Sequence, residues 1–215
     1  TSNQVTITIL PAITNNHLSP PGTTTFCGIS TPTIINGTNP PSGGAGSGTF
    51  QYQWQSSTDG THFTDISGGA NGNDYDAPAL TQTTYFQRLA KSGACSAWVP
   101  SDNVVVITIQ PGLAGSNITA TGPTTFCGPA TPGLITGDLT TGGDGTPVYQ
   151  WESSPDGGTY QPINGATGKD FSPPQISATI YYRRTVKSGS CSTPLISAPV
   201  TFTIQPALSG NNITA

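Results

Sequence analysis

The most regular hydrophobic pattern in the chain is an alternation of aromatic and amide side chains. Phe50, Tyr52 and Trp54 alternate with glutamines, and a later segment keeps Tyr149 and Trp151 in the same arrangement. Successive side chains of an extended strand point to opposite faces, so a period of two predicts a strand with its aromatic face in the core. Tyr52, Trp54, Tyr149 and Trp151 are therefore predicted core residues.

Further short strands are predicted because β-branched runs alternate with Gly, Pro, Asn and Asp. Asp59-Gly60 and Asp156-Gly157 are hairpin turn signals directly after the aromatic segments. About seven strands in roughly 100 residues, with a core tryptophan on the third main strand, are typical of an immunoglobulin-like sandwich. The other predicted strands lie at 63–66 and 160–163, at 84–90 and 180–186, and at 104–109 and 200–204.

The chain contains an internal repeat of almost its whole strand pattern. The separation between matching segments falls from 100 to 95 residues along the chain, as shorter loops in the second copy would produce. Residues 24–28 recur at 124–128, residues 52–57 at 149–154, residues 91–96 at 187–192, and residues 107–111 at 202–206.

The repeat predicts four parts. Residues 1–11 match the strand that closes each copy, residues 12–111 and 112–206 are complete copies, and residues 207–215 match the start of a copy. We expect the chain to be a piece of a longer tandem array of domain-sized units. Because a short spacer that contains a proline separates the copies, the predicted architecture is all-β, with two tandem immunoglobulin-like β-sandwich domains in an extended rod.

One cysteine lies on each side of the core tryptophan in each copy, Cys27 and Cys95 in the first and Cys127 and Cys191 in the second. Four cysteines allow three connectivities. We favour structural disulfides within each copy, because an independently folding copy must supply both of its own sulfurs. Each would be worth roughly 4 kcal/mol in the chain-entropy model and would indicate export to an oxidising compartment.

Composition excludes several classes of protein. Charged residues make up only 7% of the chain, and its six Lys and Arg residues are scattered, so they cannot form the basic surface that nucleic acid requires. No run of about 18 apolar residues occurs, so we expect no membrane insertion. The net charge of −4 favours solubility.

Candidate catalytic groups are few. His17 and His62 have no counterparts in the second copy, where Thr159 replaces His62, and Glu152 is the only glutamate. A Ser-His-Asp site or a pair of catalytic carboxylates needs more than these side chains. We therefore predict no catalytic residues, no cofactor and no enzyme activity.

Metal binding is also not expected. Residues 71–76 offer several oxygens within six positions, and Ca²⁺ takes six to eight oxygen ligands. The second copy, however, places Lys169 in the middle of the same loop, where its charge would repel a cation. A zinc site would use paired cysteines or histidines at short spacing, and the chain has no such pair.

Other residues are candidates for surface or structural roles. Arg88 and Arg184 recur and could lie over an aromatic face. Trp54 and Trp151 could stack on sugars, although their duplication and alternation favour core packing. Trp98 has no counterpart in the second copy, so it is the better candidate for an exposed ligand contact. Asparagines of possible glycosylation sequons are Asn36, Asn117 and Asn212.

The motifs resemble a known family. Thr-Thr-Phe-Cys-Gly, Tyr-Gln-Trp-Gln-Ser-Ser-Thr-Asp-Gly, Thr-Tyr-Phe-Gln-Arg and Ser-Gly-Ala-Cys-Ser follow one another, and the second copy carries the same series. This order is similar to the Ig-like repeats of the giant secreted surface adhesins of gliding bacteria, commonly exported by type IX secretion. The resemblance covers nearly all of the chain, and one departure from it is Trp98, which is not repeated in the second copy. It implies an extracellular, cell-surface repeat used for adhesion or as a stalk.

Three functions follow as hypotheses. The leading one is a non-enzymatic segment of a bacterial cell-surface adhesin or stalk, whose partners are neighbouring repeats of the same chain and whose candidate ligands are surface glycans or other cells. The second is a subunit of a self-assembling extracellular filament, formed by lateral bundling or by donation of the strand at residues 3–10. The third is an accessory module of a secreted glycan-degrading enzyme.

Overall fold

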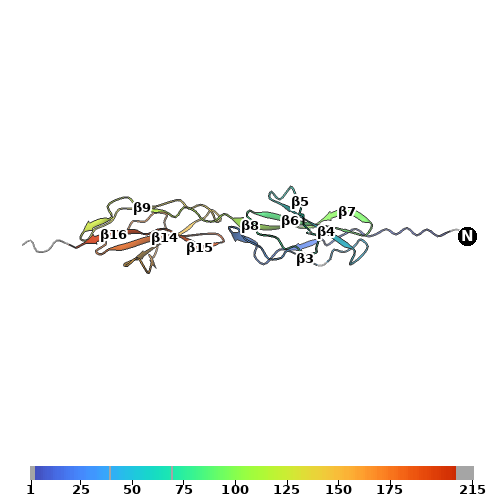
Figure 1. The fold of residues 1–215 in the computed structure, drawn as a ribbon, viewed down its shortest axis with the longest axis horizontal. Coiled ribbons are helices and arrows are strands. Elements are labelled where there is room, and N and C mark those ends of the chain that lie inside the picture. The colour runs from blue at the N-terminus through green and yellow to red at the C-terminus, as the bar shows by residue number, and fades with distance from the viewer. Residues whose placement is uncertain (1–2, 39, 69, 207–215) are drawn as a thin grey trace, which may run out of the picture. The chain divides into compact units, whose positions relative to one another are not determined.

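Two separate β units make up the protein. The structure is a computed structural model that describes residues 3–38, 40–68 and 70–206. Every regular element in those ranges is a β-strand (Figure 1). The chain divides into one unit at Thr1–Gln110 and another at Pro111–Ala215. Each unit has a large sheet and a small sheet, which confirms the predicted all-β fold of two tandem Ig-like sandwich domains.

The larger sheet of the first unit is built around β6. β4 pairs antiparallel with β6 along its whole length, from Phe50 opposite Ser92 to Ser57 opposite Tyr85. β7 and β8 pair with β6 on its other side, and β2 runs parallel to β8. The strands are β2 (Thr25–Cys27), β4 (Phe50–Ser57), β5 (Thr64–Asp65), β6 (Thr84–Ser92), β7 (Cys95–Pro100) and β8 (Val105–Gln110).

The second layer of the first unit is a short antiparallel pair, β1 (His17–Ser19) with β3 (Asn36–Thr38). An isolated bridge between Ile35 and Tyr75 extends this layer. The two layers enclose the core, because the inward side chains of both are apolar. Fully buried members of this core are Leu18, Ile35, Trp54 and Ile107.

The second unit repeats the first. Its larger sheet has the order β10-β16-β14-β12-β13, with β15 also paired to β14, and its smaller sheet pairs β9 with β11. Its core is centred on Ile135, Trp151, Tyr182 and Phe202. The strands are β9 (Ile118–Ala120), β10 (Thr125–Cys127), β11 (Ile135–Gly137), β12 (Val148–Ser154), β13 (Gln161–Pro162), β14 (Ile180–Ser188), β15 (Cys191–Ile196) and β16 (Val200–Gln205).

The tryptophans of the alternating segments lie at the centre of each core. The Trp54 and Trp151 side chains are fully buried. Trp54 Nε1 donates to Gly72 O at 3.0 Å, and Trp151 Nε1 donates to Gly168 O at 2.9 Å. The tyrosines of the same alternating segments are also covered: Tyr149 is buried and Tyr52 is half-buried. The indole rings are therefore packing groups whose one polar atom is satisfied.

Two other predicted parts have different outcomes. Residues 3–11 are assigned to no strand, and Val5, Ile7 and Ile9 are more than 80% exposed. In the two complete repeats the matching strands, β8 and β16, pair within their own repeat, so the role of residues 1–11 as a closing strand stays a prediction. Residues 207–215, predicted as the start of another copy, lie outside the described residues.

Candidate functional site

The four cysteines are in two chemical states. Cys27 and Cys191 are disulfide-bonded, whereas Cys95 and Cys127 are free thiols. The predicted disulfides within each copy, Cys27 with Cys95 and Cys127 with Cys191, are therefore wrong.

Strand register explains why neither predicted pair forms. Cys27 lies opposite Gln110 at the end of β8, whereas Cys95 lies opposite Ser92 at the end of β6. β6 and β8 are antiparallel, so the two cysteines lie at opposite ends of the sheet. β6 is nine residues long, which at roughly 3.3 Å per residue separates them by about 25 Å or more. A disulfide needs Cα atoms within about 7 Å.

The second unit has the same arrangement. Cys127 lies opposite Gln205 at the end of β16, and Cys191 lies opposite Ser188 at the end of β14. Because β14 and β16 are antiparallel, these two cysteines also lie at opposite ends of their sheet.

A buried arginine lies at the centre of a similar set of contacts in each unit. The Arg88 side chain, on β6, is fully buried. Its Nε and Nη2 donate to Asn16 Oδ1 at 3.0 and 2.8 Å, and its Nη1 donates to Asn73 O at 2.6 Å. Its guanidinium carbon lies 4.5 Å from the centre of the Tyr52 ring. Burial lowers the Arg88 pKa, and the contacts join three segments that are distant in sequence.

Arg184 occupies the same position in the second unit with fewer partners. It is fully buried and lies 4.5 Å from the centre of the Tyr149 ring. Its Nη1 and Nη2 donate to Lys169 O at 2.7 Å and to Asp138 O at 2.9 Å, but among the described residues its Nε has no hydrogen-bond partner. Burial lowers the Arg184 pKa as well.

A single residue difference explains the unpaired Nε. β1 and β9 have the same register, with Leu18 opposite Gly37 and Ile118 opposite Gly137. Ser116 is therefore the counterpart of Asn16. A serine hydroxyl ends one bond after Cβ, whereas the asparagine amide oxygen of the first unit extends two bonds beyond Cβ and reaches the arginine.

Ser116→Asn is expected to stabilise the second unit by about 1–2 kcal/mol, because it supplies an acceptor to a buried, charged donor. The measurement is hydrogen exchange of β14 amides, with β6 amides as the internal reference. Asn16→Ser is the matched variant and should destabilise the first unit by a similar amount. Unchanged protection of β14 in the Ser116→Asn chain would contradict this account of the network.

Glycine is required where the guanidinium group of each arginine packs against a strand of the smaller sheet. A Cβ atom placed on Gly37 would lie 1.6 Å from Arg88 Nη1, and one on Gly137 would lie 2.0 Å from Arg184 Nη1. No side chain fits at either position unless the guanidinium moves. These two glycines, which the sequence pattern did not single out, are part of the arginine sites.

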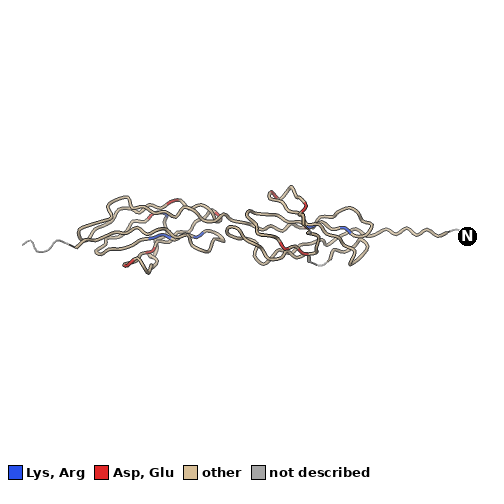
Figure 2. Tube along the Cα trace, in the orientation of Figure 1, with Lys and Arg blue, Asp and Glu red and all other residues tan. Residues whose placement is uncertain are grey.

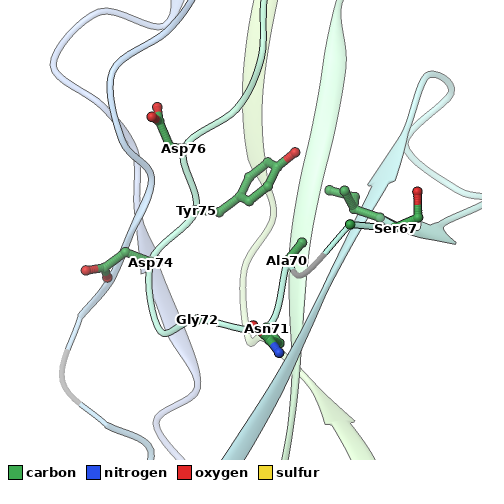
Figure 3. Close-up of a pocket in the computed structure, with 9 residues that line it drawn as sticks. Ser67, Ala70, Asn71, Gly72, Asp74, Tyr75 and Asp76 are labelled. Atoms are coloured by element: carbon green, nitrogen blue, oxygen red, sulfur yellow. The ribbon is translucent and has the colours of Figure 1, made fainter.

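The loop considered for calcium forms a pocket of about 470 Å³ in the first unit. Figure 3 shows the carboxylates of Asp74 and Asp76 pointing in different directions. Asp74 Oδ1 accepts from Gly37 N at 2.8 Å and from Asn73 Nδ2 at 2.9 Å, so this oxygen closes the loop. Within the described residues, no group of three His, Cys, Asp or Glu side chains is placed to hold a metal.

The second unit closes the same loop with a lysine. Asp170 Oδ1 accepts from Gly137 N at 2.9 Å and from Lys169 Nζ at 2.7 Å. Lys169 Nζ also donates to Gly137 O at 3.0 Å, as Asn73 Nδ2 does to Gly37 O at 2.7 Å in the first unit. The bond from Lys169 is the main cause of the lowered Asp170 pKa. Asn73 and Lys169 are thus equivalent donors to one loop.

The two histidines are each paired with an aspartate on the surface. His17 Nδ1 lies 2.6 Å from Asp102 Oδ1, and His62 Nδ1 lies 2.7 Å from Asp59 Oδ2. The backbone N–H of His62 also donates to Asp59, and this bond is the largest cause of the lowered Asp59 pKa. Asp59 therefore closes the hairpin turn that its sequence predicted.

Trp98 lies on the outer surface of the first unit. It is 40% exposed, and Lys91 Nζ lies 4.3 Å from the centre of its ring. Figure 2 shows that acidic and basic residues are sparse along the described chain. Trp98 with Lys91 is therefore a local feature of an otherwise nearly uncharged surface.

The comparison with known families matches both repeats. The family described as Domain of unknown function (DUF8696) matches residues 16–111 and again residues 116–206. The chain belongs to this family. Each of the two units described above thus contains one DUF8696 repeat, with its buried arginine, its core tryptophan and its two cysteines.

Solved structures resemble the DUF8696 pair in fold. The fibronectin(III)-like modules of Clostridium thermocellum CbhA are 12% identical with a TM-score of 0.33, over 96% of this chain and 100% of that one. A Dscam structure titled for isoform specificity is 13% identical with a TM-score of 0.35, over 91% of this chain and 46% of that one. The N-terminal four Ig domains of Dscam1 isoform 1.9 are 13% identical with a TM-score of 0.34, over 85% and 43%.

This chain spans less than half the length of the two Dscam chains. No curated protein sequence matches it. Among the described residues no helix is long and apolar enough to cross a membrane.

Proposed function

We propose that this pair of DUF8696 repeats is a non-enzymatic segment of a bacterial cell-surface adhesin or stalk built of tandem Ig-like sandwiches. The observation that carries the proposal is that each repeat closes on itself. β8 pairs with both β2 and β6 of its own repeat, and β16 pairs with β10 and β14. A unit that satisfies its own sheet can be repeated in series without depending on its neighbours for folding.

The chemistry of the chain agrees with an extracellular stalk. Disulfide-bonded cysteines are typical of oxidising, extracellular compartments. Because only 7% of the residues are charged, surface ion pairs, which salt screens, contribute little to its stability. The order of motifs that resembles the repeats of giant secreted adhesins supports the cell-surface assignment.

The exposed segment at residues 3–11 bears on the filament alternative. Val5, Ile7 and Ile9 repeat the alternation of a closing strand and are exposed, so this segment could pair with the sheet edge of another subunit. In both complete repeats, however, the position of that strand is already filled by β8 or β16. Donation into either repeat would require displacement of a native strand, and this favours the stalk.

Small-angle X-ray scattering of the 215-residue chain tests the proposed stalk. A compact globule of this length has a radius of gyration of about 17 Å, and we expect a clearly larger value that does not change with protein concentration. A value near that of the globule would contradict an extended rod. A value that rises with concentration would instead support lateral bundling.

A further inference from the structure

Trp98 lies on the outer face of the larger sheet of the first unit. The side chains of β6 are alternately buried and half-buried, so Arg88 points into the core and Lys91 points away from it. Lys91 Nζ lies 4.3 Å from the centre of the Trp98 ring, which places the indole on the same outer face. This face is formed by β4, β6 and β7 (Figure 1).

Strand register sets the neighbours of the Trp98 ring in two rows across these three strands. With strands about 4.8 Å apart and about 6.8 Å between alternate residues of one strand, the rows make a flat surface about 10 Å wide and about 7 Å long. We call this surface the Trp98 platform. Its residues, row by row, are Gln51, Lys91 and Trp98, then Gln53, Leu89 and Pro100.

The Trp98 platform is open to solvent and already formed. Gln51 is exposed, and Trp98 is 40% exposed. Gln53 Nε2 donates to Trp54 O at 2.8 Å and to Ile66 O at 3.1 Å, so its amide is held in place. A ligand that lies on the platform therefore pays little of the entropy cost of ordering a flexible surface.

The charge of the platform is positive. Lys91 contributes an ammonium group, and the other residues of the platform carry no charge. Among the described residues, no aspartate or glutamate forms an ion pair with Lys91. Because charge complementarity selects partners at a surface, the platform favours a ligand with an anionic group at one point.

A sugar acid has the chemistry that fits this surface. The face of an aromatic ring is negatively polarised, and the C–H groups of a pyranose ring, which are positively polarised, pack against it. The amide of Gln51 can donate to and accept from sugar hydroxyl groups, and a sugar carboxylate can pair with the ammonium group of Lys91.

Single-stranded nucleic acid fits the platform less well. Its bases also stack on aromatic rings, but its phosphates need a series of basic side chains along the backbone. The platform has Lys91 as its one basic residue.

We propose that the Trp98 platform binds an acidic oligosaccharide, with one uronic acid ring stacked on Trp98 and its carboxylate paired with Lys91. Gln51 hydrogen-bonds with the hydroxyl groups of the same or the adjoining sugar. This inference deepens the proposed adhesin function and rests on it, because it gives the surface segment a class of ligand.

The second repeat keeps the lysine of the platform and lacks its ring. Strand register makes Pro194 the counterpart of Trp98. Lys187 is the counterpart of Lys91, and Val148 lies opposite Lys187 where the first repeat has a glutamine. The proposal therefore confines acidic sugar binding to the first repeat and makes the second an internal control.

Isothermal titration calorimetry of the 215-residue chain tests the ligand class. The probes are hexagalacturonate and hexamannuronate, and the fully methyl-esterified forms present the same rings without charge. We expect one acidic hexasaccharide bound per chain, and binding of its ester weaker by about tenfold or more, the loss expected for one charged hydrogen bond. No binding of either acid at millimolar concentration, or equal affinity for acid and ester, would overturn the proposal.

Trp98→Ala and Lys91→Gln test the site itself. Each should weaken binding of the acidic hexasaccharide by about tenfold or more, whereas Trp98→Phe keeps an aromatic face and should retain most of the affinity. Lys187→Gln is the matched control in the second repeat and should change nothing. Hydrogen exchange at β6 amides checks that the first repeat stays folded. Unchanged affinity in a folded Trp98→Ala chain would remove the site.

A graft onto the second repeat tests the same assignment by gain of binding. Val148→Gln together with Pro194→Trp places an amide and an indole beside Lys187. We expect the stoichiometry to rise from one to two acidic hexasaccharides per chain. An unchanged stoichiometry, with β14 amides still protected from exchange, would contradict the assignment of the site to the ring, the amide and the ammonium group.

Other occupants of the platform give different results with the same chain. A second copy of the chain would appear in sedimentation as a dimer that Trp98→Ala dissociates. A nucleic acid would appear as binding of hexathymidylate that is as tight as binding of the hexuronates and equally dependent on Trp98. Either result would overturn the assignment to an acidic glycan.

The two proposals fail separately. Scattering measures whether the chain is extended and does not depend on any sugar. Calorimetry measures only what the Trp98 platform binds. An extended chain that binds no hexuronate would leave the stalk function standing and remove the glycan site.

Discussion

Arg88→Leu is expected to destabilise the first repeat by about 3–5 kcal/mol, because it leaves the buried acceptor of Asn16 and the part-buried acceptors of Asn73 without donors. Arg88 donates four hydrogen bonds to these two residues. Leucine fills part of the same volume but provides no donor. The measurement is denaturant dependence of hydrogen exchange at β6 amides, with β14 amides as the reference in the same molecule.

Arg184→Leu provides the matched control for this prediction. Arg184 donates two hydrogen bonds through its Nη atoms and already has an unpaired Nε. Its replacement therefore removes fewer bonds and also removes an unsatisfied polar atom, so the loss of stability should be smaller than for Arg88. Equal losses of stability in the two repeats would show that the number of hydrogen bonds donated by each arginine does not determine how much it stabilises its repeat.

Trp54→Ala is expected to cost the first repeat about 3–5 kcal/mol, the range found for large aromatic residues removed from well-packed cores. Trp54 stacks on Tyr75 with the ring centres 5.4 Å apart. The substitution also leaves Gly72 O without the indole donor. Equilibrium unfolding in urea, monitored through hydrogen exchange at β4 amides, measures the effect.

Trp98→Ala is the control for the loss of an indole ring. Trp98 is 40% exposed and its ring contacts the ammonium group of Lys91, so its removal should change stability by no more than about 0.5 kcal/mol. A large loss at Trp98, or a small one at Trp54, would reverse the assignment of these two rings to surface and core.

The strands of each sandwich were predictable because their cause is local. The alternation around Trp54 predicts β4, and β-branched runs bounded by turn residues predict β6 and β8. β7 was not predicted, because its residues, beginning at Cys95, are mostly exposed and carry no apolar alternation. Its strand conformation comes from pairing with β6.

The arginine sites and the state of the cysteines could not be read in the same way. Asn16 and Arg88 are 72 residues apart in sequence, and only the folded sheets bring them together. The pairing of Cys27 was mispredicted because sequence spacing does not tell which end of a sandwich a residue occupies. That information comes from the parallel register of β2 on β8.

The parallel pairing of β2 with β8 has a mechanical consequence. β2 lies near the start of the first repeat and β8 at its end, and the pair is flanked by backbone bonds of 2.7 Å from Thr108 N to Thr24 O and from Gly28 N to Gln110 O. When the ends of such a repeat are drawn apart, two parallel strands slide along each other, so tension is shared by all their bonds together and does not open them one by one. A module with this geometry therefore resists extension until several hydrogen bonds break together.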